Sequence, residues 1–326
     1  MLLPATVNAA LLFSPALDAT CSAVANLPVR LLAAVSGGLD SCVLLDALVL
    51  SGKRPTVVHF DHGWRPDSGE DAAFVGQLAA SYGLTFLEEK GCSAGNESEG
   101  TARKRRYEFF ACAARTAGCC DLALGHHAED QVETLLLQLL RGTGSHARGM
   151  RESESRDGLR LHRPFLWLDR SRMREHARVR GLCWREDRSN DDRRYLRNRI
   201  RHELLPFLEE RFSPHVRRSL LRFCRVRIAE EEWMTELVRK EAEGNSLSIA
   251  DLGHSPLGRQ RRVVHLWLRR RGVPDISLAD VESVRGLACG EQKGREYPLA
   301  GGWHAVRKDG EISLKHLALP CASINT

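Results

Sequence analysis

The chain has 326 residues, of which 43% are hydrophobic and 28% are charged, a composition that excludes a disordered or fibrous protein and allows two domains. The formal net charge of +6 says little about partners by itself. No uninterrupted apolar stretch reaches the roughly 18 residues of a membrane-spanning helix, so we expect no membrane segment.

The cysteine pattern and the first residues bear on the location of the protein. The ten cysteines include no CxxC pair and no CxxC-plus-histidine spacing, which disfavours a zinc site and favours a reduced, cytoplasmic protein. Residues 1–27 are apolar, but they lack a basic start and are interrupted by Pro4 and Pro15. We therefore interpret them as an N-terminal extension and not as a signal peptide.

Short apolar runs alternate with helical patterns through the first two hundred residues. This alternation predicts stacked βαβ units, with a twisted parallel sheet and helices on both faces. The predicted elements are strands 30–35, 56–60, 85–88 and 122–124 and helices 41–49, 71–82, 101–117 and 128–140. Because ligands bind such sheets at the carboxyl ends of the strands, the residues after each strand are candidates for a site.

The first strand runs into a glycine-rich turn that opens a helix. Its sequence is Ser36-Gly37-Gly38-Leu39-Asp40-Ser41. The two glycines permit positive φ and close approach of a ligand, the serines add hydroxyl donors, and the helix start supplies backbone N–H groups for phosphate. A Walker A loop needs a lysine that is missing here, so γ-phosphate transfer is not the expected chemistry. An ordinary capped turn is the alternative.

Two further motifs precede the fourth predicted strand. The second strand ends in His59-Phe60-Asp61-His62-Gly63-Trp64-Arg65, where His62 is the best candidate for a nucleotide contact and a structural role in the turn is the alternative. The helix at 101–117 begins with four consecutive cations at 103–106. Arg103 and Arg106 lie three apart and can bind an anion from one helix face, but the spacing does not decide which of them points inward.

Acidic residues follow the fourth predicted strand. The sequence there is His126-His127-Ala128-Glu129-Asp130-Gln131-Val132-Glu133-Thr134. A helix places Asp130 and Glu133 on one side near its N-terminal end. Carboxylates in this place can hold Mg²⁺ on ATP phosphates or bind an ammonium group, and the alternative is that they only stabilise the helix dipole.

The remaining residues predict a charged loop and a second domain. Residues 151–158 are charged and indicate an exposed loop. Ser213-Pro214 begins a helix that carries Ala229, Trp233 and Leu237 on one face, so we place the domain boundary near Phe212, between 1–212 and 213–326. Helices at 258–271 and 277–287 and short strands within 297–317 predict a smaller, mainly helical C-terminal domain.

Positive charge is concentrated in one block of the chain. Residues 168–227 contain 18 arginines, no lysine and nine acidic residues, a local charge of +9, and the rest of the chain sums to −3. Such a block is typical of a surface that binds nucleic acid. A solvated helix face in a protein that prefers arginine to lysine is the alternative.

These motifs together resemble a known family. The glycine-rich turn is similar to the SGGxDS signature of the PP-loop ATP pyrophosphatases. Residues 184–206 contain WREDRSNDD and YLRNRIRHELLP, which sharpen the resemblance to the tRNA(Ile)-lysidine synthase family. That family combines SGGxDS with HxDHGxR, RxxRY, HHxxDQxET and W-x-E-D-x-S-N-x-D…Y-x-R-N-x-I-R. The resemblance covers roughly residues 31–212.

The resemblance implies a ligase that attaches the side-chain amine of free L-lysine to the wobble cytidine of an isoleucine tRNA with a CAU anticodon. Cytidine O2 attacks the α-phosphate of ATP and releases pyrophosphate, and lysine then displaces AMP from C2. Mg²⁺ would neutralise the departing pyrophosphate.

The resemblance also implies roles for individual residues. Residues 36–41 and His62 would contact ATP, and Asp40 and Asp130 would hold Mg²⁺. Asp130 and Glu133 would bind the lysine ammonium or the metal. Arg106 and Arg197 would contact phosphate or substrate.

Departures and rival functions remain at this point. Glu129 precedes Asp130 where many members have a second aspartate, and residues 145–148 replace the usual Gly-Leu step after Gly144. Longer members have an additional C-terminal domain, so contacts to the acceptor arm are not carried over. A tRNA thiolase of the same superfamily is disfavoured by the missing CxxC pairs. A non-catalytic tRNA-binding protein is disfavoured by the intact acids, and the sequence leaves a homodimer open.

Overall fold

The computed structural model describes residues 14–63, 68–91, 99–143, 147–186, 193–290 and 295–317. By packing, the chain divides into two compact units, Met1–Leu137 with Gly149–Cys224 and Gln138–Arg148 with Arg225–Thr326. The division falls within helix α9 (Val216–Leu237). The sequence-based boundary near Phe212 stays a prediction.

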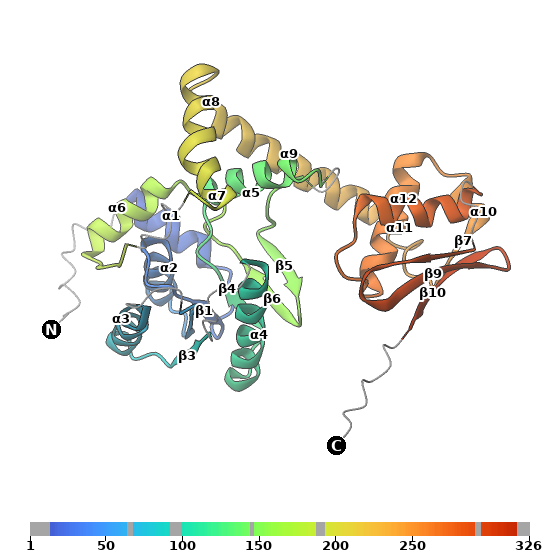
Figure 1. Cartoon of the computed structure of the whole chain (residues 1–326). Coiled ribbons are helices and arrows are strands. Elements are labelled where there is room, and N and C mark those ends of the chain that lie inside the picture. The colour runs from blue at the N-terminus through green and yellow to red at the C-terminus, as the bar shows by residue number, and fades with distance from the viewer. Residues whose placement is uncertain are drawn as a thin grey trace. The chain divides into compact units, whose positions relative to one another are not determined.

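A six-stranded sheet forms the centre of the first unit (Figure 1). In spatial order its strands are β3 (Phe86–Lys90), β2 (Thr56–Asp61), β1 (Leu32–Ala34), β4 (Asp121–Ala123), β6 (Leu159–His162) and β5 (Ser153–Arg156). The first five are parallel to their neighbours, and β5 pairs antiparallel with β6 at the edge. The predicted parallel sheet is confirmed.

The helices of the first unit lie before, between and after these strands in the chain. They are α1 (Pro15–Val24), α2 (Leu39–Leu50), α3 (Ser68–Ser81), α4 (Glu99–Ala117), α5 (Ala128–Leu140), α6 (Arg170–Arg180), α7 (Leu196–Arg199), the π-helix η4 (Ile200–Leu204) and α8 (Leu205–Arg211). All four predicted helices in this region are confirmed. The helix predicted at Ser213-Pro214 begins two residues after the proline, at Val216, and its Trp233 and Leu237 are exposed.

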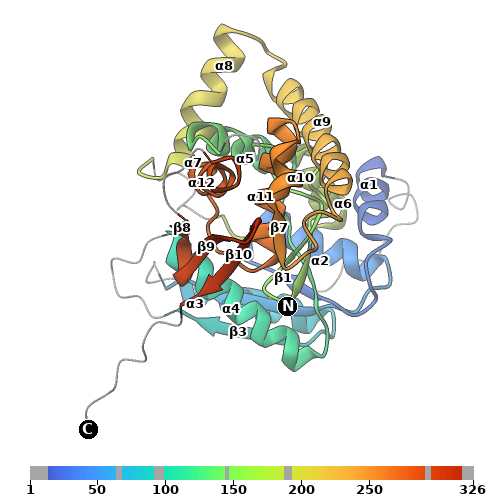
Figure 2. The ribbon, with the colours of Figure 1, turned by 90° about the vertical axis from the view of Figure 1, so that its right-hand side faces the viewer.

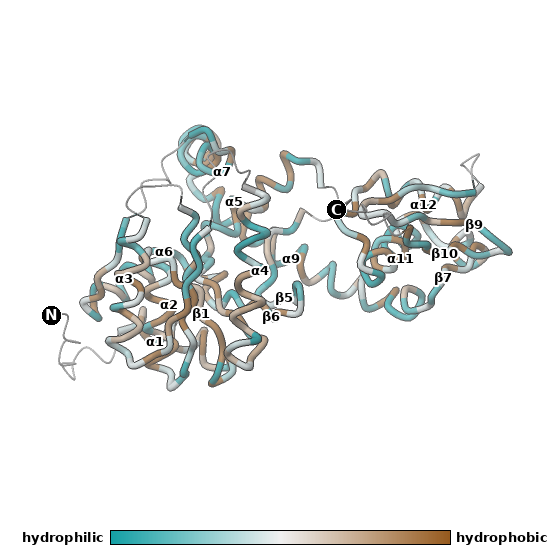
Figure 3. Tube along the Cα trace, turned by 60° about the horizontal axis from the view of Figure 1, so that its bottom comes forward, coloured by the Kyte–Doolittle hydropathy of each residue, from teal (hydrophilic) through white to brown (hydrophobic). Residues whose placement is uncertain are grey.

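Two apolar cores cover the two faces of the sheet. On one face, β1 and β2 pack against α1, α2, α3 and α6, with Leu44, Leu45 and Phe165 fully buried. On the other face, Tyr107 and Phe110 of α4 pack against Leu32 and Leu122. In Figure 3 the apolar segments of this unit gather around β1 and α2. The sheet is therefore rigid, and the loops at its carboxyl edge are supported from both sides.

The prediction of an exposed loop at 151–158 is wrong, because part of this segment forms strand β5. It forms a hairpin with β6 through Asp157 and Gly158, which both have positive φ (51° and 78°). An edge strand has one face and one edge toward water, so charged residues are tolerated there. The Asp-Gly pair is a hairpin signal that the charge pattern of this segment obscured.

The second unit combines helices with a small antiparallel sheet. Its elements are β7 (Ser246–Ser248), α10 (Ile249–Gly253), α11 (Leu257–Arg270), α12 (Leu278–Cys289), β8 (Glu296–Pro298), the 3₁₀ turn η5 (Ala300–Gly302), β9 (Trp303–Lys308) and β10 (Glu311–His316), with strand order β7-β10-β9-β8. Figures 1 and 2 show the three helices on one side of this sheet. The predicted helices are confirmed, and Ser277 and Asp280 form a capping box at α12. The three residues of β7 are too few for a sequence signal.

Two expectations from composition can be compared with the described residues. None of the described helices combines the length and the apolar character needed to cross a bilayer. The eight described cysteines are free thiols.

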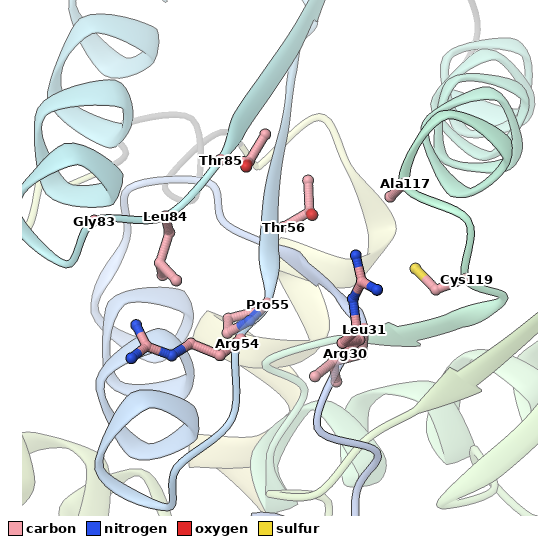
Figure 4. A pocket seen from close by; sticks show the side chains of 10 residues that line it. All are labelled: Arg30, Leu31, Arg54, Pro55, Thr56, Gly83, Leu84, Thr85, Ala117 and Cys119. Atoms are coloured by element: carbon pink, nitrogen blue, oxygen red, sulfur yellow. The ribbon is translucent and has the colours of Figure 1, made fainter.

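A pocket of about 190 Å³ lies at the amino edge of the parallel sheet (Figure 4). Its lining includes residues at or just before the starts of three strands, Leu31, Thr56 and Thr85. Arg30 and Cys119 face each other across it. Ligands of parallel sheets bind at the opposite, carboxyl edge, so we do not assign the site to this pocket.

A buried polar network joins three helices of the first unit and the residue after α3 around Asp46 of α2, whose side chain is 0% exposed. The Asp46 carboxylate accepts hydrogen bonds from Tyr82 and from the Arg180 guanidinium at 3.0 and 3.2 Å, and it lies 2.8 Å from His176 Nε2. His176 Nδ1 in turn bonds the Thr20 hydroxyl at 2.7 Å. Burial by itself would raise the pKa of Asp46, but these partners lower it overall.

Replacing Asp46 by Asn should therefore destabilise the first unit by roughly 3–5 kcal/mol, because the Arg180 charge then loses its partner. The pKa of Asp46 is lowered in the folded state, so its contribution is complete above the unfolded pKa and is lost as the pH falls below about 4. Hydrogen exchange of the α2 amides in a urea series measures this free energy. The exposed pair of Glu175 with Arg178 provides the control, because Glu175→Gln should leave the exchange unchanged. Equal stability of Asp46→Asn and the unsubstituted protein at pH 7 would contradict the role of the network.

Candidate functional site

The glycine-rich turn between β1 and α2 is closed by its two serines. The Ser41 hydroxyl donates to the Gly38 carbonyl at 2.8 Å and accepts the Ser36 N–H at 3.2 Å. Gly37 has φ of +90°, which a residue with a side chain rarely adopts, whereas Gly38 has φ of −75°. Only the first glycine therefore uses the predicted left-handed conformation. Because the first N–H groups of α2 lack intrahelical acceptors, the turn presents donors and the positive helix end to an anion.

Two neighbouring segments fix this turn. Gly125, after β4, passes so close to α2 that a Cβ there would lie 3.1 Å from the Asp40 carbonyl oxygen. Arg185, in the segment after α6, donates its N–H to the Gly37 carbonyl at 2.9 Å. Its guanidinium pairs with Glu70 at 2.9 Å and with Asp71, both at the start of α3. The turn is thus held from two directions before any ligand binds.

His127 lies at the centre of a group of three carboxylates. Its Nδ1 is 2.8 Å from Glu129, and its Nε2 is 3.5 Å from both Asp40 and Asp130. Burial would lower the pKa of His127, but the bonds to Asp40 and Glu129 and the charge of Asp130 raise it to about 10. His127 is therefore a buried cation beside the glycine-rich turn.

Glu129 connects His127 to helix α6, which settles the place of the acid that departs from the usual aspartate. Besides bonding the imidazole, its carboxylate accepts the N–H of Arg170 at 3.2 and 3.3 Å, at the first turn of α6. The Arg170 side chain reaches back to Asp40, with 3.6 Å between Nε and Oδ1. Burial would raise the pKa of Glu129, but the bond to His127 lowers it overall.

Asp130 and Glu133 pair with two arginines of the α7–η4 segment. Arg197 donates to Asp130 and to Glu133, each at 2.8 Å, and Arg201 donates to Glu133 at 2.6 Å. Glu133 is 0% exposed, so these two arginines take the place of water as partners of its carboxylate. Arg201 lies in the π-helix η4, which ends two residues before Pro206. Because a proline has no N–H, Pro206 cannot donate to the carbonyl four residues earlier, which is consistent with irregular helix geometry at this point.

The pKa of Asp130 and that of His126 move in the same direction for different reasons. Burial would raise the pKa of Asp130, but the charges of His127 and Arg197 lower it to about 2. Burial lowers the pKa of His126 to about 3, and the charges of Arg163, Arg197 and Arg106 add to this effect. Asp130 is thus ionised and His126 neutral at physiological pH. The charge of Arg106 lowers the pKa of His126, so Arg106 lies near this cluster. Arg103, in contrast, is exposed.

The structure places the other sequence-predicted residues as follows. His62 follows β2, and its ring packs edge-on against Phe60 with centroids 4.9 Å apart. Asp61 closes the same turn, accepting bonds from the Gly63 N–H and the Ser68 hydroxyl. Trp64, Arg65 and residues 187–192 lie outside the described residues.

The acids at the turn can be tested for a fit to Mg²⁺. No group of three or more histidine, cysteine or acidic side chains among the described residues could hold a metal by itself. Asp40 Oδ1 is, however, buried without a hydrogen-bond partner. Asp130 is close to Asp40, because both carboxylates contact Nε2 of His127. Two carboxylates completed by phosphate oxygens are a common Mg²⁺ environment. The residues therefore fit a metal that arrives with a nucleotide.

Sequence reasoning missed Arg170 and Arg201 and left His127 without a role. Arg201 lies four residues after Arg197 on the same helix face, and this spacing could have indicated that both arginines contact the same acidic group. Arg170 carried no signal, because its contact with Asp40 depends on how α6 packs.

Comparison with known proteins agrees with this geometry. Residues 18–208, more than half of the chain, match the PP-loop domain family, and residues 247–313 match the TilS substrate binding domain. A U34-tRNA thiolase, NcsA from Methanococcus maripaludis, shares the fold, with a TM-score of 0.51 and 15% identity over 64% of this chain and 78% of that one. Fold and turn thus define a protein of the PP-loop class.

Sequence relatives identify the family within that class. A tRNA(Ile)-lysidine synthase of Thermus thermophilus is 38% identical over 303 residues, which are 87% of this chain and 56% of that protein. One of Synechococcus sp. is 35% identical over 280 residues, 81% of this chain and 83% of that protein. The chain belongs to the tRNA(Ile)-lysidine synthase family. It spans about half the length of the Thermus relative.

The pairing of Glu129 with His127 predicts a measurable pKa change. In Glu129→Gln the side chain can still accept the Arg170 N–H but has no charge, so the pKa of His127 should fall below about 10. Nuclear magnetic resonance titration of the imidazole measures it. Glu175→Gln, an exposed change on α6, should leave the titration as it is. An unaltered His127 pKa in Glu129→Gln would mean that Asp40 and Asp130 alone hold the proton.

Proposed function

We propose that the protein catalyses the ATP-dependent attachment of free L-lysine to the wobble cytidine of an isoleucine tRNA with a CAU anticodon, giving lysidine. The observation that carries the proposal is the cluster at the carboxyl edge of the sheet. There, the glycine-rich turn lies beside Asp40, the ionised Asp130 and the cationic His127. Membership of the lysidine synthase family supports the same conclusion.

The chemistry needs two displacements. Oxygen at C2 of cytidine is a poor leaving group, so O2 first attacks the α-phosphorus of ATP and pyrophosphate departs. The lysine amine, having lost a proton, then attacks C2, and AMP leaves with the original oxygen. The turn suits ATP bound through its inner phosphates. In that complex the N–H donors of α2 and the His127 cation would both face the negative charge of the phosphates.

Individual residues can be assigned within this scheme. Residues 36–41 and His62 would bind ATP, with Asp40 and Asp130 holding Mg²⁺, which would neutralise the departing pyrophosphate. Asp130 would also face the lysine amine, because its side chain is 13% exposed, whereas that of Glu133 is fully buried. Glu133 would act by positioning Arg197 and Arg201. Arg106 and Arg197 would contact phosphate or substrate.

The arginine block would bind the tRNA, and the TilS domain match at 247–313 supports a second region of contact. Exposed arginines of the block include Arg172, Arg174, Arg211, Arg218 and Arg222. Charges of this kind bind phosphates independently of sequence. ATP and tRNA as substrates support a cytoplasmic location.

Mass spectrometry of tRNA nucleosides after incubation with ATP and lysine tests the function. We expect a cytidine enlarged by lysine minus water, together with AMP and pyrophosphate. Asp130→Asn should lower this yield by at least about 100-fold, because a charge at the reacting groups is lost, while tRNA binding is retained.

Glu241→Gln is the matched control, since Glu241 is an exposed acid paired with Arg259 in the second unit. It should behave as the unsubstituted protein. ADP and orthophosphate as the only spent products would refute the proposed chemistry. Full turnover of Asp130→Asn would remove that residue alone from the mechanism.

Affinity for tRNA should fall steeply with salt, because arginine–phosphate pairs release counterions when they form. Arg218→Gln removes the charge of one such pair, so it should reduce the slope of log affinity against log salt by about 0.7–0.9. Fluorescence anisotropy of labelled tRNA across a salt series measures the slope. Arg54→Gln, an exposed change at the amino edge of the sheet and outside the block, should keep the original slope. An affinity that does not change with salt would contradict the role of the block.

A further inference from the structure

Helix α8 and the residue directly after it carry two exposed aromatic side chains that contact each other. Phe207 is 52% exposed and Phe212 is 72% exposed, and their ring centroids lie 5.7 Å apart at an angle of 66°. Single exposed apolar residues are common, but adjacent exposed rings form a patch that water does not favour. Figures 1 and 2 show α8 extending away from the sheet of the first unit.

The helix that carries this aromatic pair is fixed in place. Leu205 is fully buried and packs with Ile200 against Val132 and Leu136 of α5. Since the start of α8 is held by this contact, Phe207 on the helix and Phe212 at its end are positioned before a partner binds. A preformed surface loses less conformational entropy on binding than a mobile one.

The surroundings of the aromatic pair are strongly basic. Residues 193–227 contain 11 arginines, no lysine and three acidic residues, a local charge of +8. Arg211, Arg218 and Arg222 are exposed on or after α8. Aromatic rings among arginines are the combination that binds single-stranded nucleic acid, since bases stack on the rings and phosphates pair with the guanidiniums.

The aromatic pair also lies close to the site along one helical path. Arg201, which bonds Glu133, is followed without a break by α8. At about 1.5 Å per residue, Phe207 lies roughly 9 Å along the helix and its last residue, Arg211, roughly 15 Å, with Phe212 directly after it. Stacked nucleotides advance about 3.4 Å each, so these distances correspond to a few nucleotides.

We propose that Phe207 and Phe212 form a stacking site for unpaired RNA bases that flank the target nucleotide. The inference rests on the proposed function, because it takes the RNA substrate as the partner. A second copy of the chain is the rival occupant. Arg197 and Arg201 pair with Asp130 and Glu133, but Arg211, Arg218 and Arg222 remain exposed. A two-fold symmetric contact would bring two such basic surfaces together, which repels, whereas RNA supplies the opposite charge.

Binding of two RNA probes by substituted proteins tests the stacking site. The probes are a synthetic stem-loop with CAU in its loop and a fully paired RNA duplex of equal length. In the double variant Phe207→Leu with Phe212→Leu, the surface remains apolar but loses its rings. Its dissociation constant for the stem-loop should rise about 5- to 150-fold, while duplex binding stays unchanged.

Controls separate stacking from other effects. The double variant Phe207→Trp with Phe212→Trp should retain stem-loop binding, and Val29→Ala, an exposed apolar change before β1, should have no effect. The dissociation constant of the Leu variant for the stem-loop, divided by that of the unsubstituted protein, should stay constant as the salt concentration rises, because stacking releases few counterions. Analytical ultracentrifugation should give the same molecular mass for the unsubstituted protein and for every variant, because the substitutions should not change the oligomeric state.

Several outcomes would overturn the stacking site. These are unchanged stem-loop binding in the Leu variant, equal loss for stem-loop and duplex, or a dimer that dissociates on substitution. Unchanged binding together with normal lysidine formation on full-length tRNA would refute the stacking site and leave the proposed function intact. Failure of the unsubstituted protein to bind either RNA would refute both.

Discussion

The ion pairs of Asp130 and Glu133 with Arg197 and Arg201 are the interaction on which the site depends. They join residues 64 to 71 positions apart, and Glu133 has no exposure to water that could replace its partners. A carboxylate buried without such partners would be neutral or strongly destabilising. The α7–η4 segment must therefore dock on α5 for these ion pairs to form.

Charge balance explains why so many ionised groups can lie together beside the turn. Asp40, Glu129, Asp130 and Glu133 are matched by His127, Arg170, Arg197 and Arg201, each within 3.6 Å of an opposite charge. A triphosphate would add negative charge to a balanced group. Binding then favours a companion cation, which suits both a metal carried by the nucleotide and the ammonium of a substrate.

The sequence determined the local features of the fold and left the long-range ones open. Helix α5 matched its predicted bounds, since an apolar stripe and first-turn acids mark it. The β5–β6 hairpin was missed because its strands are polar at a sheet edge. Asp40 and Asp130 were predicted from strand ends, but Arg170 and Arg201 were not. The packing of α6 and η4 determines their partners, and only the four-residue spacing of Arg201 from Arg197 gave a signal in the sequence.

The arginine block divides into two groups with different consequences. Arg180, Arg185, Arg197 and Arg201 pair with acids that lie outside the block, namely Asp46, Glu70, Asp71, Asp130 and Glu133. The charge of +9 counted along the chain therefore overstates the charge that the surface exposes. The same segment holds the fold and the site together with its inward arginines, and only its outward ones are available to phosphates. Composition alone cannot separate these groups, because burial and partner choice distinguish them.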